Sequence, residues 1–191
     1  MNPLVGLTAV NDAAENAIPA RCGQDGPVRT SDLDPVWDIR VVPYDHHDSR
    51  RLVAEVQQEY VVRYGGPDET PVQYAEFSPP QGLFVVLYDH GVPAAMGGWR
   101  MTGPGVAELK RMYVVPSHRG RGFARAVLRH LESSAAAAGA AQVVLETGTR
   151  QPEAIALYAA SGYAPVPAFG HYADQPDSIH LGKPLTATES S

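Results

Sequence analysis

Residues 114–128, VVPSHRGRGFARAVL, constrain the fold of this chain more than any other segment. An alternating, strand-like run ends at Pro116, two closely spaced glycines follow, and a helical apolar period begins at Phe123. The segment therefore predicts a strand, a tight loop and a helix in immediate succession. Backbone N–H groups in the first turn of such a helix have no partner within the helix. Together with the helix dipole, they form a site for phosphate oxygens.

The loop itself has the composition of a phosphate site. Gly120 and Gly122 let the backbone approach a ligand without a Cβ in the way, and Ala124 is small for the same reason. Guanidinium groups, which fork onto phosphate oxygens, are supplied by Arg119, Arg121 and Arg125. The chain has a net charge of -6, which disfavours a nucleic-acid partner and favours a single diphosphate at this loop. The plain alternative is a tight turn with solvated arginines, because short glycine motifs are common.

Two nucleotide sites with named motifs can be tested on the sequence. A Walker loop ends in Gly-Lys-Ser/Thr, and the chain contains no such ending. A dinucleotide fingerprint needs a third small residue where Arg125 stands, and it opens a βαβ unit rather than following several strands. Glu146 does end the next expected strand, as an NAD-type acid would. A nucleotide-binding redox domain therefore stays open as a weaker alternative.

The rest of the chain predicts one α/β or α+β layer structure. Residues 1–35 have neither structural period and predict a weakly ordered tail, residues 36–185 form the domain, and 186–191 are a short C-terminal tail. Periodicity, glycines and prolines within the domain predict its order of elements. That order is a strand at 36–44, a helix at 48–66, three strands over 83–116, a helix from 122 to 139, a strand at 141–147, a helix at 151–162 and two strands over 163–185.

Several classes of protein and site are disfavoured. Cys22 is the single cysteine, so neither a disulfide framework nor a cysteine-based zinc site is possible. The first residues have no basic start, and no apolar run of about 18 residues occurs. The expectation is therefore a cytoplasmic protein with no secretory signal and no membrane span. The sequence His46-His47-Asp48 has metal-binding residue types, but the spacing fits no metal site, so a solvated helix start and no metal are expected.

At this point the motifs resemble a known family. Residues 119–124, RGRGFA, fit the Q/R-x-x-G-x-G/A signature of the GNAT superfamily of acyl-CoA-dependent N-acetyltransferases. The preceding ELKRMYVVP is similar to that family's acetyl-CoA-contacting strand. VVLETGTRQPEAIALYAASGY is similar to its second conserved block. The resemblance covers roughly residues 37–185, with Arg119 in place of Gln and Ala124 in place of the last Gly.

The resemblance implies a fold and a coenzyme site. The fold is a mixed, mostly antiparallel, V-splayed sheet with helices on both faces, and acetyl-CoA lies in the splay. The backbone of one strand pairs with the pantetheine arm, the glycine loop holds the pyrophosphate, and Gln151 touches the pantetheine. The implied acetyl-CoA contacts are Met112, Tyr113, Val114, Arg119, Gly120, Arg121, Gly122, Phe123, Ala124, Arg125 and Gln151.

Acetylation of an amine places two demands on the site. An alkylammonium with a pKa near ~10.4 must lose a proton before it can attack, and a carboxylate usually accepts it. Glu146, at the end of the splayed strand, is the first candidate for this base and Glu108 is the second; each is also open to interpretation as a solvated strand-end glutamate. The departing thiolate needs a donor, and the resemblance assigns that role to Tyr158. Full proton transfer from a phenol to the thiolate is uphill by about 2 kcal/mol, so a strengthening hydrogen bond is expected.

The sequence therefore predicts an N-acetyltransferase that moves the acetyl group of acetyl-CoA to a primary amine, on a small molecule. The acidic balance and the compact chain favour a small cationic acceptor over nucleic acid or protein. The alternatives are a non-catalytic acyl-CoA-binding regulatory module and an enzyme that acetylates a peptide or protein amine. A homodimer is compatible with the resemblance, because dimers are common among similar proteins.

Overall fold

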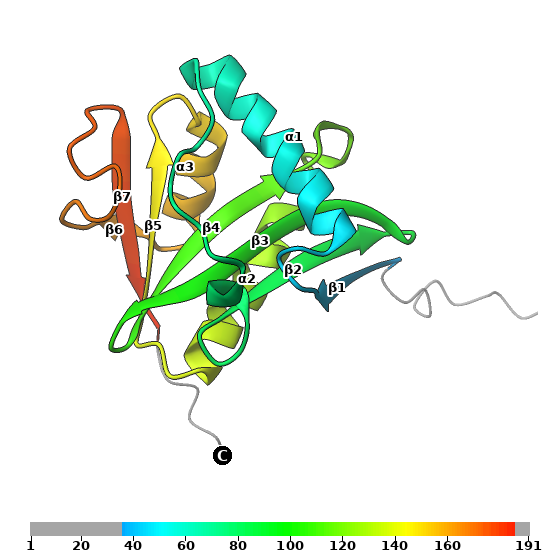
Figure 1. Ribbon diagram of the computed structural model, residues 1–191, viewed down its shortest axis with the longest axis horizontal. Coiled ribbons are helices and arrows are strands. Elements are labelled where there is room, and N and C mark those ends of the chain that lie inside the picture. The colour runs from blue at the N-terminus through cyan, green and yellow to red at the C-terminus, as the bar shows by residue number, and fades with distance from the viewer. Residues whose placement is uncertain (1–35, 186–191) are drawn as a thin grey trace, which may run out of the picture. The chain divides into compact units, whose positions relative to one another are not determined.

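A computed structural model describes residues 36–185 of the chain, which form one seven-stranded sheet flanked by helices (Figure 1). The strand order is β1-β2-β3-β4-β5-β7-β6, and every neighbouring pair is antiparallel except β4 and β5. The strands are β1 (Trp37–Val41), β2 (Gly82–Asp89), β3 (Val92–Gly103), β4 (Val106–Val114), β5 (Gln142–Gly148), β6 (Ala164–Pro165) and β7 (Ser178–Pro184). The helices are α1 (His47–Tyr64), α2 (Phe123–Ala137) and α3 (Pro152–Ala160), with short 3-10 turns at Tyr74–Phe77 and Pro116–His118.

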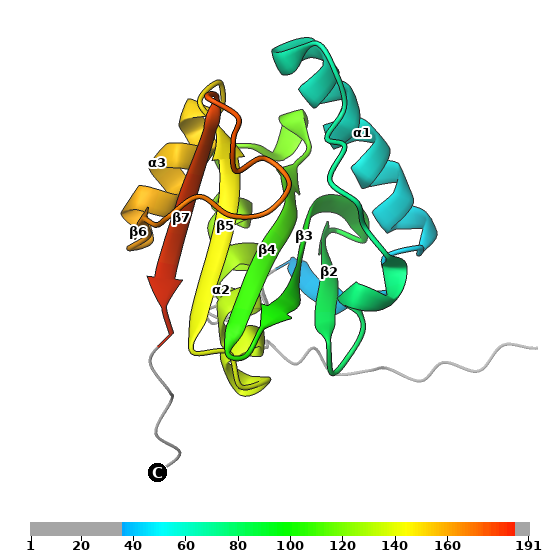
Figure 2. The same ribbon diagram turned by 60° about the vertical axis from the view of Figure 1, so that its left-hand side comes forward.

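The two faces of the sheet carry separate apolar clusters. Along β2, Val85 and Leu87 pack with the apolar stripe of α2, whereas Phe84 and Val86 pack with α1. Because successive strand residues point to opposite faces, α1 and α2 must cover opposite faces. Figure 2 shows α1 on one side of the sheet and α2 and α3 on the other. This double cover explains why β2 and β3 read as almost continuous apolar runs.

The sheet opens between its two parallel strands. β4 and β5 pair only over the three positions Val106↔Gln142, Ala107↔Val143 and Glu108↔Val144. Beyond these positions the two strands diverge, as the ribbon shows plainly (Figures 1 and 2). The second half of β4 therefore has a sheet partner, β3, on one edge only.

A β-bulge lies in β4 at the start of this opening. Met96 of β3 pairs with Tyr113, but Gly98, two residues on, pairs with Lys110, three residues back. The extra residue in β4 is accommodated by Arg111, which has a φ of 60°. A positive φ is unusual for a residue with a Cβ, so the side-chain contacts of Arg111 must hold this conformation in place.

The fold class predicted from the sequence is confirmed, because the sheet is mixed, mostly antiparallel and splayed, with helices on both faces. The predicted order of strands and helices is also the observed one. The tails expected at residues 1–35 and 186–191 lie outside the described residues. Between residues 36 and 185, no helix is both long enough and apolar enough to cross a membrane.

Candidate functional site

A cleft of about 1010 Å³ is lined by residues from both sides of the opening between β4 and β5. Its walls come from α1, the segment after it, the second half of β4, the glycine loop, the end of β5, the start of α3 and the segment before β7. The cleft brings together most of the residues predicted from the sequence, which are Met112, Tyr113, Val114, Arg119, Gly120, Gly122, Phe123, Ala124, Arg125, Glu146, Gln151 and Tyr158. Two predicted residues, Glu108 and Arg121, do not line it.

The glycine loop depends on left-handed backbone conformations. Gly120 has a φ of 76°, and Gly122, the N-cap of α2, has a φ of 83°. A Cβ at either position would meet no atom within 4 Å, so the backbone conformation rather than lack of space requires glycine here. The loop turns the chain so that the first turn of α2, with its unpaired N–H groups, borders the cleft.

The three arginines of the loop have different surroundings. Arg119 donates from Nε to the carbonyl of Val114 at 3.0 Å, and its guanidinium pairs with Glu59. Arg121 turns away from the cleft and binds Asp89 at 2.5 Å. Arg125 lines the cleft, is exposed, and has no ion pair within residues 36–185. Arg125 is therefore the cation of the loop with the most freedom to meet an anion.

The edge of β4 that faces the cleft has the form of an open strand. Met112, Tyr113 and Val114 line the cleft, and β5 does not pair with them. An unpaired strand edge offers N–H and C=O groups to an extended ligand. Across the cleft, Gln151 precedes α3 and donates from Nε2 to the hydroxyl of Tyr64 at 3.3 Å.

Tyr158 projects from α3 with its ring buried and its side chain on the cleft. The ring makes an edge contact with Tyr163, with centroids 5.5 Å apart. Burial raises the pKa of the Tyr158 phenol, so the group keeps its proton at neutral pH. Among the described residues its hydroxyl has no hydrogen-bond partner, which leaves it free to donate to a group in the cleft.

Glu146 lies near the end of β5, where its side chain is 15% exposed. The Ser178 hydroxyl donates to Glu146 Oε1 at 3.1 Å, and Lys110 Nζ lies 3.9 Å from Oε2. Burial raises the pKa of this carboxyl above the ordinary glutamate value, and Lys110 and Ser178 partly oppose that effect. A carboxylate with a raised pKa is better matched to accepting a proton from an amine.

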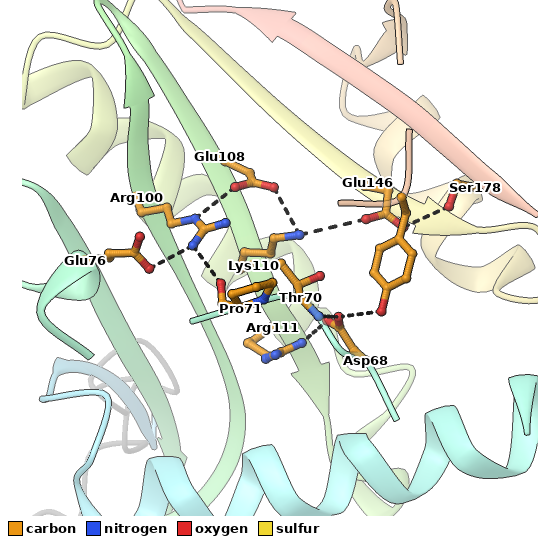
Figure 3. Close-up of polar contacts among 11 residues, drawn as sticks. Asp68, Thr70, Pro71, Glu76, Arg100, Glu108, Lys110, Arg111, Glu146 and Ser178 are labelled. Atoms are coloured by element: carbon orange, nitrogen blue, oxygen red, sulfur yellow. Dashed lines mark hydrogen bonds and ion pairs between the residues drawn. The ribbon is translucent and has the colours of Figure 1, made fainter. Parts of the chain in front are cut away.

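Glu108 lies on the other side of Lys110 and lines a second pocket of about 780 Å³. It is buried, and its oxygens meet Arg100 Nε at 2.9 Å and Lys110 Nζ at 3.0 Å. Figure 3 shows Arg100, Glu108, Lys110 and Glu146 in a row across the strands. Since both carboxylate oxygens of Glu108 are held by cations, Glu146 is better placed to act as a base.

One part of the cleft, the contact between Arg111 and Asp68, was not predicted from the sequence. The Arg111 guanidinium pairs with the Asp68 carboxylate (Figure 3). Its Nε also donates to the Tyr44 hydroxyl at 3.3 Å. Asp68 also accepts from the Tyr172 hydroxyl at 3.1 Å. The only signal for this cluster in the sequence was the consecutive pair of cations, Lys110 and Arg111, in ELKR. In a regular strand consecutive side chains point to opposite faces, so one of these two charges would have to lie on the face opposite the other. The bulge turns Lys110 and Arg111 toward the same face.

The His46-His47-Asp48 sequence forms the start of α1. Ligand atoms of the three side chains lie within 4.8 Å of one another. His46 Nδ1, however, accepts the backbone N–H of Asp48 at 3.3 Å as a helix cap, and Asp48 accepts the Tyr88 hydroxyl at 2.7 Å. These contacts are those of a helix start.

Comparisons with known proteins agree with this geometry. The chain is 43% identical over 107 residues to a protein of Azospirillum brasilense named IAA acetyltransferase, an alignment that covers 56% of this chain and 70% of that protein. A crystal structure from Klebsiella pneumoniae, assigned as an acyl-CoA N-acyltransferase, superposes with a TM-score of 0.66 at 27% identity and covers 80% of this chain and 100% of that one.

The PaiA N-acetyltransferase of Thermoplasma acidophilum, solved in complex with coenzyme A, shares the fold with a TM-score of 0.60 at 13% identity and covers 78% of this chain and 98% of that one. The family model described as the acetyltransferase (GNAT) family matches residues 45–163. These residues include α1, the glycine loop and α3. The chain belongs to the GNAT family of acetyltransferases, enzymes that use acetyl-CoA.

Proposed function

We propose that this acetyltransferase moves the acetyl group of acetyl-CoA to a primary amine of a small molecule by direct attack within the cleft. The observation that carries the proposal is that Glu146, Tyr158 and the glycine loop all line one cleft. In this proposal the cleft supplies an anion site, an open strand edge, a proton acceptor and a proton donor in a single space.

In this proposal the coenzyme follows the open edge of β4. N–H groups of the glycine loop and the Arg125 guanidinium hold the pyrophosphate, and the backbone of residues 112–114 pairs with the pantetheine arm. Arg119 contributes charge near the same place, although Glu59 shares its guanidinium. Arg121 contributes at most at long range, since it is bound to Asp89 outside the cleft.

The chemistry follows from the two side chains at the opening. Glu146 accepts one proton from the ammonium, and the neutral nitrogen then attacks the thioester carbonyl. A C–N bond forms, the C–S bond breaks, and the nitrogen releases a second proton to give the amide. Tyr158 donates a hydrogen bond to the sulfur as negative charge develops. Because burial raises the pKa of the Tyr158 phenol, the tyrosine acts only as a hydrogen-bond donor. Of the two protons that leave the nitrogen, one goes to the thiolate, and the one on Glu146 is released to solvent.

A small-molecule acceptor is supported by two observations. The relative from Azospirillum brasilense is named for acetylation of IAA, by its printed name a small-molecule activity. The cleft is also lined by Glu69, an exposed carboxylate with no ion pair among residues 36–185, which attracts an ammonium.

The test is an acceptor screen. Purified protein, acetyl-CoA and single amines from the amino acid, polyamine, aminoglycoside and peptide classes are incubated, and thiol release is followed together with the mass of each amine. We expect amine-dependent thiol release and gain of one acetyl group by a small amine. Turnover restricted to peptides would overturn the small-molecule proposal. Binding of acetyl-CoA with no amine-dependent thiol release would favour a regulatory module.

A further inference from the structure

Lys110 occupies an unusual place in the sheet. Its side chain is 8% exposed, and it lies on β4 at the point where β5 stops pairing with that strand. The ammonium meets Glu108 on its own strand at 3.0 Å and Glu146 on β5 at 3.9 Å. Among the ion pairs of residues 36–185, Lys110–Glu146 is the one that joins β4 to β5 across the opening.

Lys110 belongs to a row of alternating charges that crosses three strands (Figure 3). Glu76 contacts Arg100 at 2.8 Å, Arg100 contacts Glu108 at 2.9 Å, and Lys110 continues the row to Glu146. The row contains three carboxylates and two cations, so it carries one unbalanced negative charge. Glu146 stands at the end of the row, beside the cleft, where that charge meets an incoming ammonium.

The two distances around Lys110 imply that its ammonium acts differently on Glu108 and on Glu146. At 3.0 Å the ammonium donates a hydrogen bond to Glu108, whereas at 3.9 Å its effect on Glu146 is a charge effect without a hydrogen bond. A buried carboxylate with no cation nearby would hold its proton at neutral pH, and one in a tight ion pair would bind a proton too weakly to serve as a base. Glu146 lies between these extremes because Glu108 holds the ammonium at a distance from it.

We propose that Lys110 is a positioning residue for acetyl transfer, which keeps the Glu146 carboxylate ionised at the cleft, and that Glu108 limits this effect by binding Lys110. This inference rests on the proposed role of Glu146 as base. Lys110 also lines the cleft, but it has no chemical step of its own.

The charged and titratable groups around Glu146 come from three elements other than β5 and from the segment after α1. They are Lys110 on β4, His180 on β7, Asp68 after α1 and Tyr60 on α1. The hydroxyl of Ser178 adds a hydrogen bond. Lys110 is the one lysine or arginine in this set that acts directly on Glu146, and Glu108 acts on Glu146 mainly through Lys110.

Substitutions of Lys110 and of Glu108 are expected to shift the pKa of Glu146 in opposite directions. Lys110→Met removes the cation and keeps the side-chain volume, so the pKa of Glu146 rises by at least about one unit. Glu108→Gln removes a carboxylate and frees Lys110 toward Glu146, so that pKa falls. Lys110→Arg keeps the charge and stays close to the unchanged protein. A purely structural role for Lys110 would not move the pKa in two directions.

The experiment follows Glu146 directly by carbon NMR of protein with labelled glutamate carboxyl groups, assigned with Glu146→Gln. In parallel, kcat/KM for an amine found in the screen is measured against pH, and thermal melting checks that each variant is folded. The acidic limb is expected to move up by about one pH unit or more in Lys110→Met and down in Glu108→Gln. Unchanged NMR titration in folded Lys110→Met, or shifts of the same sign in both variants, would overturn the inference.

The outcome also separates this inference from the proposed function. If Glu146→Gln keeps full turnover while the NMR titrations shift as expected, Glu146 is not the base, but Lys110 still controls its ionisation. If Glu146→Gln abolishes turnover and the titrations do not respond to Lys110, the proposed function stands and the role given to Lys110 is wrong. Loss of turnover at every pH in Glu108→Gln, with its Glu146 titration unmoved, would instead make Glu108 the base.

Discussion

At the scale of single residues, the same side chain type takes different roles according to what already binds it. Arg121 is bound to Asp89, and Arg119 is shared with Glu59, whereas Arg125 meets the cleft without a carboxylate partner in the described part of the chain. A guanidinium already paired with a carboxylate has less to gain from a phosphate, because it must exchange one anion for another. The sequence named all three arginines as ligands, and it could not rank them because Asp89 and Glu59 are distant along the chain.

Arg125→Ala should raise the KM for acetyl-CoA about tenfold, since a charge-assisted hydrogen bond contributes roughly 1.5–3 kcal/mol. Arg121→Ala is the matched control on the same loop, and it should leave that KM within a factor of about two. Initial rates at varied acetyl-CoA measure both. An equal rise in the two variants would mean that the loop acts through its overall charge rather than through Arg125.

Tyr158→Phe should lower kcat by about 100-fold while calorimetry still detects acetyl-CoA binding, because the hydroxyl acts only as the sulfur becomes charged. Tyr163→Phe is the control, since its ring contacts that of Tyr158 but does not line the cleft. Full activity in Tyr158→Phe would remove the tyrosine from the mechanism.

Glu146 sets the expected pH dependence. Burial raises the pKa of its carboxyl, and the base must be ionised to accept a proton, so kcat/KM should rise with pH through a value above that of an ordinary glutamate. Glu146→Gln should remove this limb and most of the activity. A rate profile that keeps its acidic limb in Glu146→Gln would assign the limb to another group.

At the scale of elements, short-range signals were sufficient to predict some features and insufficient for others. The glycine loop and α2 follow from a local change of period, so they could be predicted from the sequence. The bulge at Arg111 could not, because it depends on how β4 pairs with β3 and on Asp68, far along the chain. The row of charges from Arg100 to Glu146 could not be predicted either, because it depends on the register of strands that are far apart in the sequence.

Gly122→Ala tests the loop conformation at this scale. The strain of a Cβ at positive φ should cost roughly 1–2 kcal/mol of stability and should also weaken acetyl-CoA binding. Gly139→Ala is a closely matched control, because Gly139 has a φ of 91°, has open space around its Cβ position, and lies after the other end of α2, outside the cleft. It should lose similar stability in urea unfolding and keep its affinity for acetyl-CoA. Equal affinity in the two variants would argue against the loop as the phosphate site.

The link between Arg111 and Asp68 fastens the segment after α1 to the bulge. Burial opposes ionisation of Asp68, but Arg111 and the Thr70 backbone outweigh it and lower the pKa of this carboxyl. Because the pKa of Asp68 is lower in the folded than in the unfolded protein, its charge stabilises the fold at pH values above the unfolded pKa. That stabilisation is lost as the pH falls through the folded pKa. Asp68→Asn should therefore cost on the order of 3 kcal/mol at neutral pH.

This deficit should begin to narrow below about pH 4, where an unfolded aspartate takes up a proton, and should narrow further as the pH falls through the lower pKa of folded Asp68. Glu69→Gln, at the exposed neighbouring position, serves as control and should change stability little. Urea unfolding at several pH values measures the difference. A deficit that is independent of pH would show that Asp68 stabilises the segment by packing rather than by charge.

At the scale of the whole molecule, the site exists because the sheet opens. Parallel pairing of β4 with β5 stops after three positions, which frees one edge of β4 and brings Glu146 and Tyr158 to the same cleft as the glycine loop. The overall V shape was predicted from the resemblance of two sequence blocks to a family, not from any strand by itself. The order of elements needed only local patterns.

The most direct measurement is a crystal structure of the protein with coenzyme A. We expect the diphosphate against the N–H groups of residues 120–125, the pantetheine along residues 112–114, and the sulfur within hydrogen-bond reach of the Tyr158 hydroxyl. A coenzyme bound outside the opening between β4 and β5, or a sulfur directed away from Tyr158, would contradict the central claim that one cleft both holds the coenzyme and carries out the transfer.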